Sequence, residues 1–370
     1  MDIDEFVGNI KDFQENFLKV VNKDYGQEED LDKDLKFLIE SMNPIFLTDK
    51  DKFKVILKVI LSISNNYHRV PDFISNICKI IILMKSDIKN VFSNDDIFHI
   101  FEKNKRIMLF ILEEKILLID ENVISNIKKS EYGYQEYFQP EICPNLTSIT
   151  NEFNEKRHAG ENDDYICKLI QNDFIDDFVT YVNQTNFPLN FKIKPSIFET
   201  NRFLLENKTS LIEYSAFYGS IQIFNYLYIN NVKITSKLWL YAIHGANHQI
   251  IRRLEEDNVI NKNDKKTFEK CLEESLKCHH NDIATYVSEY LISDKDQKKI
   301  IQFSFKYNNF YLFPLEKENN LSIDLQSIFY YACQYEYFDI VSYILNSKKE
   351  EIDINFTFYL NYLNTFTNLK

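Results

Sequence analysis

The chain has 370 residues and a net charge of −13, from 43 lysines and arginines against 56 aspartates and glutamates. This acidic balance disfavours nucleic acids and anionic membranes as partners, because both bind to positively charged surfaces. Only six glycines and seven prolines are present, which disfavours an all-β fold with its many tight turns. We therefore expect an all-α protein that binds neither nucleic acid nor membrane.

The expected cellular location follows from what the sequence lacks. The first ten residues are acidic and have neither the basic nor the apolar stretch of a signal peptide. Apolar stretches at 54–63, 79–84 and 107–119 are shorter than the ~20 residues that cross a membrane, or are broken by charges. The six cysteines are scattered, as in proteins whose thiols stay reduced. The sequence predicts a cytoplasmic protein, with the nucleus as an alternative.

Amphipathic helices are expected at the start of the chain. Apolar residues recur at helical spacing over 4–21, which predicts a helix with one buried face. A second helix is expected over 53–63, and Thr48 has the side chain of an N-terminal cap for it.

A third helix is expected over 104–119, where the apolar pair Ile107 and Met108 resembles the markers of the repeat described below. Residues 1–130 are thus predicted to be a helical N-terminal region. This region is either a degenerate part of that repeat array or a separate helical domain.

A linker or domain boundary is expected over residues 131–164. This stretch concentrates glycine, proline and charged residues, which favour turns and loops. Its aromatic segment at 132–140 is still expected to be ordered, because its rings can pack.

A helical hairpin recurs through the C-terminal part and is clearest at 210–230. An apolar pair in the second helix marks each copy, at intervals of 27 to 33 residues. The markers are Ile223/Phe224, Ile250/Ile251, Ile283/Ala284, Tyr311/Leu312 and Ile340/Val341. Eight residues earlier stand Ser215, Ala242, Ser275, Phe303 and Ala332. Four of these five are small, as a close approach of two helices requires.

The turn between the two helices varies more than the packing positions do. Only Gly219 is a glycine at the turn; the equivalent residues are Ala246, His279, Tyr307 and Glu336. Pro314 would interrupt the second helix of the fourth copy, which we expect to be distorted.

The repeat resembles the ankyrin family, in particular the ankyrin-repeat family known as DUF3447. The resemblance covers roughly residues 155–345, and its best stretches are 160–182, 193–204, 211–227, 238–256 and 271–287. The Thr-Pro-Leu-His opening of ordinary ankyrin repeats is absent, and Ser-Leu-Ile-Glu stands there at 210–213. The resemblance implies an ankyrin-like helical-hairpin solenoid over 165–370, which holds partners in its concave groove.

No metal or cofactor is expected. Cys271 and Cys278 lie two helical turns apart, about 11 Å, which is too far for one tetrahedral zinc ion, even with His279 and His280 nearby. His244 and His248 are four residues apart, but the expected turn between the two helices separates them.

No catalytic site is expected either. The sequence has no nucleophile elbow and no glycine-rich phosphate loop. Its acidic pairs are adjacent in sequence, so that their side chains diverge on a helix. We therefore expect a protein that is not an enzyme.

The resemblance implies which residues bind a partner, because they precede the turn on the first helix of each copy. These weakly indicated partner-binding residues are Phe217, Tyr218, His244, Lys277, Lys306, Gln334 and Tyr335. The alternative is that Phe217 and Phe305 pack against a neighbouring repeat. The expected function is a protein–protein interaction scaffold. The alternatives are an adaptor whose N-terminal region docks a second protein, such as a ubiquitin-ligase subunit, and an enzyme without a recognisable motif.

Overall fold

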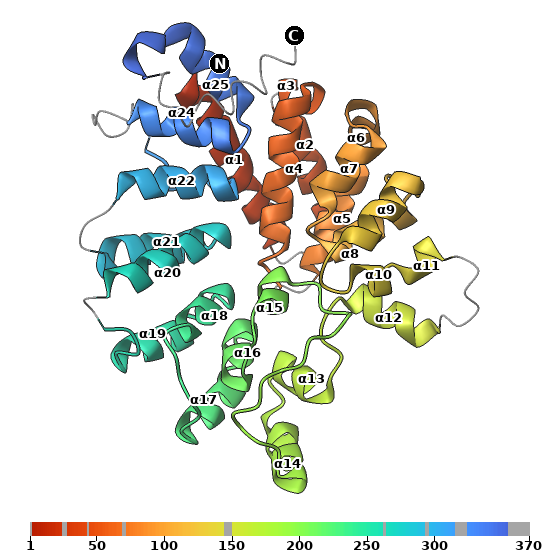
Figure 1. Cartoon of the computed structure of the whole chain (residues 1–370), viewed down its shortest axis with the longest axis vertical. Coiled ribbons are helices and arrows are strands. Elements are labelled where there is room, and N and C mark those ends of the chain that lie inside the picture. The colour runs from red at the N-terminus through yellow and green to blue at the C-terminus, as the bar shows by residue number, and fades with distance from the viewer. Residues whose placement is uncertain are drawn as a thin grey trace. The chain divides into compact units, whose positions relative to one another are not determined.

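The computed structural model describes residues 2–23, 28–42, 44–68, 72–143, 150–261, 264–292, 296–314 and 324–353. Helices make up 70% of it, as 24 helices, and the described residues contain no strand (Figure 1). The prediction of an all-α protein is confirmed. None of the described helices is both long and apolar enough to span a membrane.

The chain divides into two compact units. The split unit combines Met1–Ser62 with Ala284–Lys370, and the central unit is Ile63–Ile283. The expected division at residues 130 and 165 stays a prediction.

The split unit contains the first helices of the chain and the last. They are α1 (Ile3–Val21), α2 (Glu28–Glu40), α3 (Ile45–Thr48), most of α4 (Lys50–Ser64), a π-helical turn (Val287–Leu291), α22 (Gln297–Tyr307), α24 (Leu325–Gln334), α25 (Phe338–Ser347) and a 3-10 turn (Lys349–Glu351).

The central unit contains the helices between them. They are α5 (Phe73–Leu83), α6 (Lys85–Val91), α7 (Asn94–Phe101), α8 (Lys105–Glu113), α9 (Glu121–Lys129), α10 (Tyr134–Tyr137), α11 (Gln139–Ile142), α12 (Asn151–Ala159), α13 (Tyr165–Gln171), α14 (Ile175–Thr185), α15 (Arg202–Glu206), α16 (Leu211–Tyr218), α17 (Ile221–Ile229), α18 (Leu238–His244), α19 (His248–Glu256), α20 (Lys265–Lys277) and the start of α21 (Asn281–Tyr286).

The N-terminal helices follow the sequence prediction with two corrections. Thr48 is not the cap of α4, because it ends α3 and donates to the Pro44 carbonyl. Asp49 caps α4 instead, since its carboxylate accepts from the Lys52 backbone amide at 3.1 Å. The helix expected over 104–119 ends at Glu113, after which Lys115 adopts the left-handed conformation.

Residues 131–164 contain the short helices α10, α11 and α12. The expected packing of the aromatic segment is confirmed, because Tyr134, Tyr137 and Phe138 are all buried. The Tyr137 hydroxyl donates to the Arg157 carbonyl at 2.8 Å and ties this segment to α12. Pro144, one of the prolines of the expected linker, lies outside the residues that the structure describes.

Four of the five expected hairpins have a second helix at the marker pair, namely α17, α19, α21 and α25. All eight of these marker residues are buried. In the fourth copy Tyr311 and Leu312 lie in a non-helical turn before Pro314, so the expected distortion of that copy is confirmed. The five residues eight positions earlier lie on α16, α18, α20, α22 and α24, and all are buried.

One backbone turn joins the two helices of each hairpin. Gly219, Ala246, His279 and Glu336 have φ between 45° and 66°, the left-handed conformation that glycine adopts most easily. In the fourth copy Asn308 takes this conformation instead of the expected Tyr307. The turn geometry is therefore kept in four hairpins where the glycine is absent.

The turn also explains why small residues stand eight positions before the markers. The Ser220 amide donates to the Ser215 carbonyl at 2.9 Å, and the Tyr337 amide donates to the Ala332 carbonyl at 2.9 Å. These bonds close a Schellman motif at the end of the first helix. The small residue and the marker keep a constant separation because the same motif lies between them.

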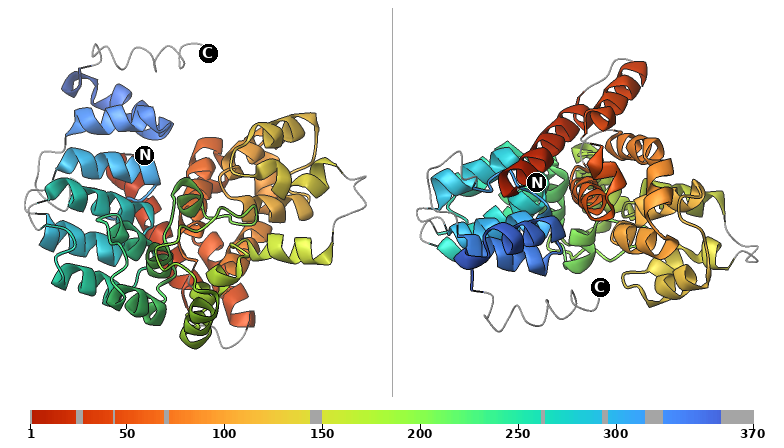
Figure 2. Two further views of the ribbon diagram at one scale, coloured as in Figure 1. Left: turned by 60° about the horizontal axis from the view of Figure 1, so that its bottom comes forward. Right: turned by 90° about the horizontal axis from the view of Figure 1, so that it is seen from above.

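Within each unit, successive first helices pack side by side. In the central unit α18 lies between α16 and α20, and in the split unit α22 packs on α24 (Figures 1 and 2). Gly245 permits the contact of α16 with α18, because a Cβ atom there would lie 2.2 Å from the Ala216 carbonyl oxygen. The ankyrin-like solenoid itself stays a prediction.

Candidate functional site

The predicted partner-binding residues lie at the C-terminal ends of the first helices, beside the left-handed turns. We call this surface, with its backbone carbonyls, the turn face of each unit. Phe217 and His244 are buried, with 0% and 1% of their surface exposed. Tyr218, Lys277, Gln334 and Tyr335 are half-buried, and Lys306 is exposed. Their role in partner binding stays a prediction.

The turn face of the central unit is covered by residues that follow α4 in the chain. The Asn66 amide donates to the Lys277 carbonyl at 3.2 Å, and the Tyr67 hydroxyl donates to the His279 carbonyl at 2.7 Å. The His68 Nε2–H donates to the Phe217 carbonyl at 2.7 Å. Residues 66–68 therefore donate hydrogen bonds to backbone carbonyls at the ends of α16 and α20. Carbonyls in the last turn of a helix have no donor within that helix, so they accept from other residues.

Aromatic rings strengthen this contact. The His68 imidazole stacks on the Phe217 ring, with 4.0 Å between centroids and 10° between planes. Tyr67 packs at 4.9 Å on His280, and on Phe73 of α5 at 5.2 Å. The buried Phe217 ring also lies 5.4 Å from the His244 ring of the next first helix, so it packs against a neighbouring copy, as one of the two interpretations of the sequence expected.

The turn face of the split unit is covered by helices α1 and α4. The buried Gln14 amide of α1 donates to the Asn309 side chain at 2.9 Å. At the end of α4 in this unit, the Ser62 hydroxyl donates to the Tyr307 carbonyl at 3.2 Å.

Ion pairs add to the cover of the split unit. The buried Lys52 ammonium lies 2.6 Å from Asp339, and Lys54 lies 3.0 Å from Glu336 at the left-handed turn. Burial alone would lower the pKa of Lys52, but Asp339 and Asp49 outweigh it and raise that pKa. The cover of this unit therefore depends on charge.

A buried chain of hydrogen bonds joins α18 and α20 in the central unit. His244 Nε2 lies 2.5 Å from Glu274 Oε1, and Cys278 Sγ lies 3.4 Å from His244 Nδ1. Burial lowers the pKa of His244 and raises that of Cys278 well above its usual value. A neutral His244 imidazole thus accepts a hydrogen bond from the Cys278 thiol and donates one to the Glu274 carboxylate. The Lys277 ammonium also forms a salt bridge with Glu274, at 3.0 Å.

These three residues are the one group within the described ranges whose ligand atoms could share a metal ion. The two ring nitrogens of His244 point in opposite directions, one toward Cys278 and the other toward Glu274. A zinc ion takes all its ligands around one point, which this arrangement does not offer. The group is a satisfied hydrogen-bond network, and the expectation of no bound metal stays a prediction.

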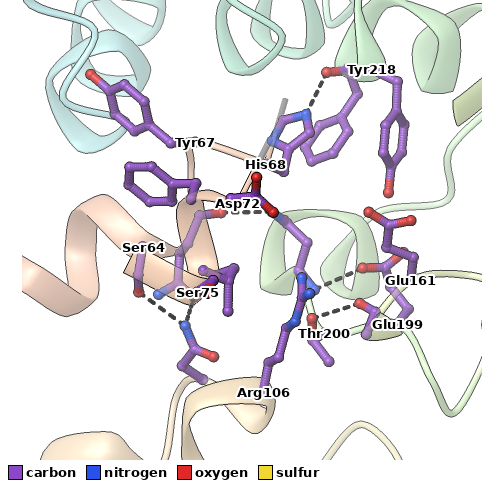
Figure 3. A pocket seen from close by; sticks show the side chains of 17 residues that line it. Ser64, Tyr67, His68, Asp72, Ser75, Arg106, Glu161, Glu199, Thr200 and Tyr218 are labelled. Atoms are coloured by element: carbon purple, nitrogen blue, oxygen red, sulfur yellow. Dashed lines mark hydrogen bonds between the residues drawn. The ribbon is translucent and has the colours of Figure 1, made fainter. Parts of the chain in front are cut away.

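A polar pocket of about 310 Å³ adjoins the turn face of the central unit. It is lined by residues from six segments of the chain, and they include Ser64, Arg106, Glu161, Glu199 and Tyr218. In Figure 3, Glu161, Glu199 and Tyr218 gather on one side of it, and Ser64 and Ser75 lie on the other. Of the predicted partner-binding residues, Phe217 and Tyr218 reach this pocket.

Glu199 is the most deeply buried acid of the pocket, with 4% of its surface exposed. Its Oε1 accepts from the Asn201 amide at 2.8 Å, whereas its Oε2 has no hydrogen-bond partner among the residues that the structure describes. Burial raises the pKa of Glu199 to about 7. The buried Lys105 ammonium fixes this loop, because it donates to the Glu199 carbonyl at 3.3 Å and to the Tyr132 carbonyl.

Two further charges face the pocket. Burial raises the pKa of Glu161, although the positive charge of Arg106 acts against that rise. Neither side chain forms a hydrogen bond or salt bridge with any residue that the structure describes. Gly160, before Glu161, has φ +67°, and a Cβ atom there would lie 3.0 Å from the Arg106 Cδ.

The sequence alone did not indicate the charged residues of the pocket or the partner of His244. Arg106, Glu161 and Glu199 come from three distant segments, and none belongs to a recognisable motif. Glu274 stands next to Glu273 in one of the adjacent acidic pairs whose side chains diverge on a helix, and nothing in the sequence links it to His244. A glycine before an acid, as at Gly160–Glu161, was the one available signal of a close approach.

The sequence and the structure were compared with known proteins. No protein-family model, no curated protein and no solved structure matches this chain. The resemblance to the ankyrin family therefore stays a prediction that depends on the residues quoted for it.

Proposed function

We propose that this chain is a non-enzymatic protein-binding scaffold that holds a protein partner on the turn face of its helical hairpins. The proposal includes the ankyrin-like character of the hairpins that the sequence resemblance implies. It does not require a metal, a cofactor or a nucleic acid.

One observation carries the proposal. The turn face of the central unit already binds a short non-helical segment, residues 66–68, by three hydrogen bonds to backbone carbonyls and by ring stacking. Contacts to carbonyls do not depend on the side chains of the turn. A segment of another protein would therefore use the same geometry at the part of the turn face that residues 66–68 do not occupy. Aromatic rings at such a surface are typical of binding hot spots.

The reactive groups near this face support a binding role over catalysis. Cys278 is the thiol closest to an imidazole, but it is fully buried and its pKa is raised well above the usual value. A thiol in that state is a poor nucleophile, because the thiolate is the reactive form.

Site-specific photo-crosslinking tests the proposal. A photoreactive amino acid is placed in the full-length chain at Lys306, Tyr335 or Lys277, and as matched controls at the exposed Ile229 and Tyr290. We expect the turn-face positions to crosslink to a discrete protein in extracts of the source cells, and the controls to give none. Equal crosslinking at both sets of positions would contradict the proposed binding face.

A further inference from the structure

The polar pocket of the central unit carries an inference beyond protein binding. At about 310 Å³ it lies at the small end of ligand sites, which span roughly 300–1,000 Å³. All of its lining residues belong to one compact unit. A site of this size suits a small molecule better than a folded partner.

Charges of both signs line this pocket without pairing. Arg106 and Glu161 are half-buried and influence each other, yet no salt bridge joins them. Both side chains keep hydrogen-bonding capacity that no described residue uses, so a ligand that supplies a partner for each gains a charge-assisted contact with both. A ligand that satisfies this pocket therefore carries a negative group that binds Arg106 and a positive group that binds Glu161.

Glu199 provides the second, independent observation. Its carboxylate is more than nine-tenths buried, lines the pocket, and keeps one oxygen without a hydrogen-bond partner. The other oxygen is held by the Asn201 amide at 2.8 Å, which fixes the direction of the group. A buried acceptor of this kind is completed by a strong donor such as an ammonium group.

We propose that the pocket binds a small zwitterion of the amino-acid type, with its carboxylate on Arg106 and its ammonium between Glu161 and Glu199. The Thr200 hydroxyl is committed to the Gly160 carbonyl at 2.7 Å, so it positions the loop and does not compete for the ligand. Phe217 and Tyr218 give the pocket an aromatic wall for an apolar or aromatic side chain.

Other ligand classes fit the same residues less well. A simple anion would meet Asp72, Glu161 and Glu199, and a simple cation would meet Arg106. A metal ion needs several ligand atoms close together, and within the described ranges these acids do not form such a group. Only a molecule that carries both charges matches both sides of the pocket.

Isothermal titration calorimetry on the full chain tests the proposal. Each of the twenty common amino acids is titrated, and phenylalanine and tyrosine are compared with phenethylamine, tyramine and 3-phenylpropionate, which keep one charge only. We expect at least one amino acid to bind. We expect each single-charge analogue to bind at least about tenfold more weakly than its parent, which is a loss of one charged contact.

Variants assign the binding to this pocket. We expect Arg106→Gln and Glu161→Gln each to weaken the amino acid at least about tenfold. Arg252→Gln and Glu256→Gln are the matched controls, because these residues form an exposed salt bridge at 2.8 Å elsewhere in the same unit. Circular dichroism and thermal melting confirm that each variant is folded before its affinity is compared.

Three results would overturn the proposal. They are the absence of binding for all twenty amino acids at millimolar concentration, an amine that binds as tightly as its parent amino acid, and wild-type affinity in a folded Arg106→Gln variant. The proposed protein scaffold does not depend on any of these outcomes, because crosslinking at the turn face is measured independently.

Discussion

The two units cover the same structural feature in different ways. In the central unit the turn face is bound by the side chains of residues 66–68, namely an amide, a phenol and an imidazole, with ring stacking on Phe217. In the split unit it is bound by helices, with the ion pairs Lys52–Asp339 and Lys54–Glu336. Backbone carbonyls beside the left-handed turns therefore accept hydrogen bonds in both units, and in the split unit carboxylates at the last turn and on α25 add ion pairs.

The largest loss of stability is expected in the central unit, where the contact between residues 66–68 and the turn face depends on the Phe217 ring. Phe217→Ala removes a fully buried ring that stacks on His68, and we expect it to lower the free energy of unfolding by about 4 kcal/mol. Denaturant unfolding followed by circular dichroism measures this loss. Ile229→Ala, at an exposed position of the same unit, is the control and should change stability little. A loss below about 1 kcal/mol for Phe217→Ala would mean that the ring is not part of a packed core.

Removal of the Lys52 charge should weaken the packing of α4 on the turn face of the split unit. Lys52→Met leaves Asp339 without its closest cation, and we expect a loss of about 3 kcal/mol in the free energy of unfolding. Hydrogen exchange should speed up in α24 and α25 and not in α16. Lys19→Met, in an exposed pair with Glu15, is the matched control and should have little effect. Unchanged exchange in α25 would contradict the role of this ion pair.

The pocket of the central unit should make stability depend on pH. The folded-state pKa of Glu199 is about 7, above the ordinary value of 4.5, so the folded protein binds a proton that the unfolded chain has lost. Stability from this group is full below pH 4.5 and is lost as the pH rises to about 7. Glu199→Gln should therefore be about 2 kcal/mol more stable than the wild type at pH 8, and not at pH 4.

The control for this measurement is Glu256→Gln, which changes an exposed acid. Glu161, Lys105, Tyr214 and Tyr218 surround Glu199, and of these Glu161 is the other carboxyl group whose pKa burial raises. An identical pH profile for the wild type and Glu199→Gln would contradict the raised pKa. Unfolding by urea at a series of pH values gives the profile.

The smallest effect concerns a single hydroxyl of the central cover. Tyr67→Phe removes the donor to the His279 carbonyl and keeps the ring on His280, so we expect a loss of about 1 kcal/mol. Tyr165→Phe is the control, because Tyr165 is exposed and its hydroxyl makes no hydrogen bond within the described residues. Equal losses in the two variants would show that the hydroxyl contributes nothing to the cover.

The comparison also shows what the sequence could and could not predict. The register of the hairpins was found because one local motif keeps Ser215 and Ile223 at a constant separation. The cover of the turn face was not found, since Tyr67 and His279 are 212 residues apart and no local pattern links them. The pocket was not predicted for the same reason, because Arg106 and Glu199 are far apart in the sequence and come together only in the folded chain.

Element boundaries failed where two local signals competed. Thr48 and Asp49 are both good capping residues, and the sequence did not show that Thr48 completes a turn of its own. The helix after Asn104 kept an apolar pattern beyond Glu113, but Lys115 adopts a left-handed conformation that periodicity cannot reveal.

Gly245 shows where this architecture tolerates change and where it does not. The turn residue varies from glycine to alanine, histidine and glutamate, and the backbone accepts all four at a modest conformational cost. At Gly245 the neighbouring helix leaves room for a hydrogen atom and for nothing larger. A chain of this kind can lose the residues by which repeats are recognised and still keep its hairpins, provided that the few points of closest contact stay small.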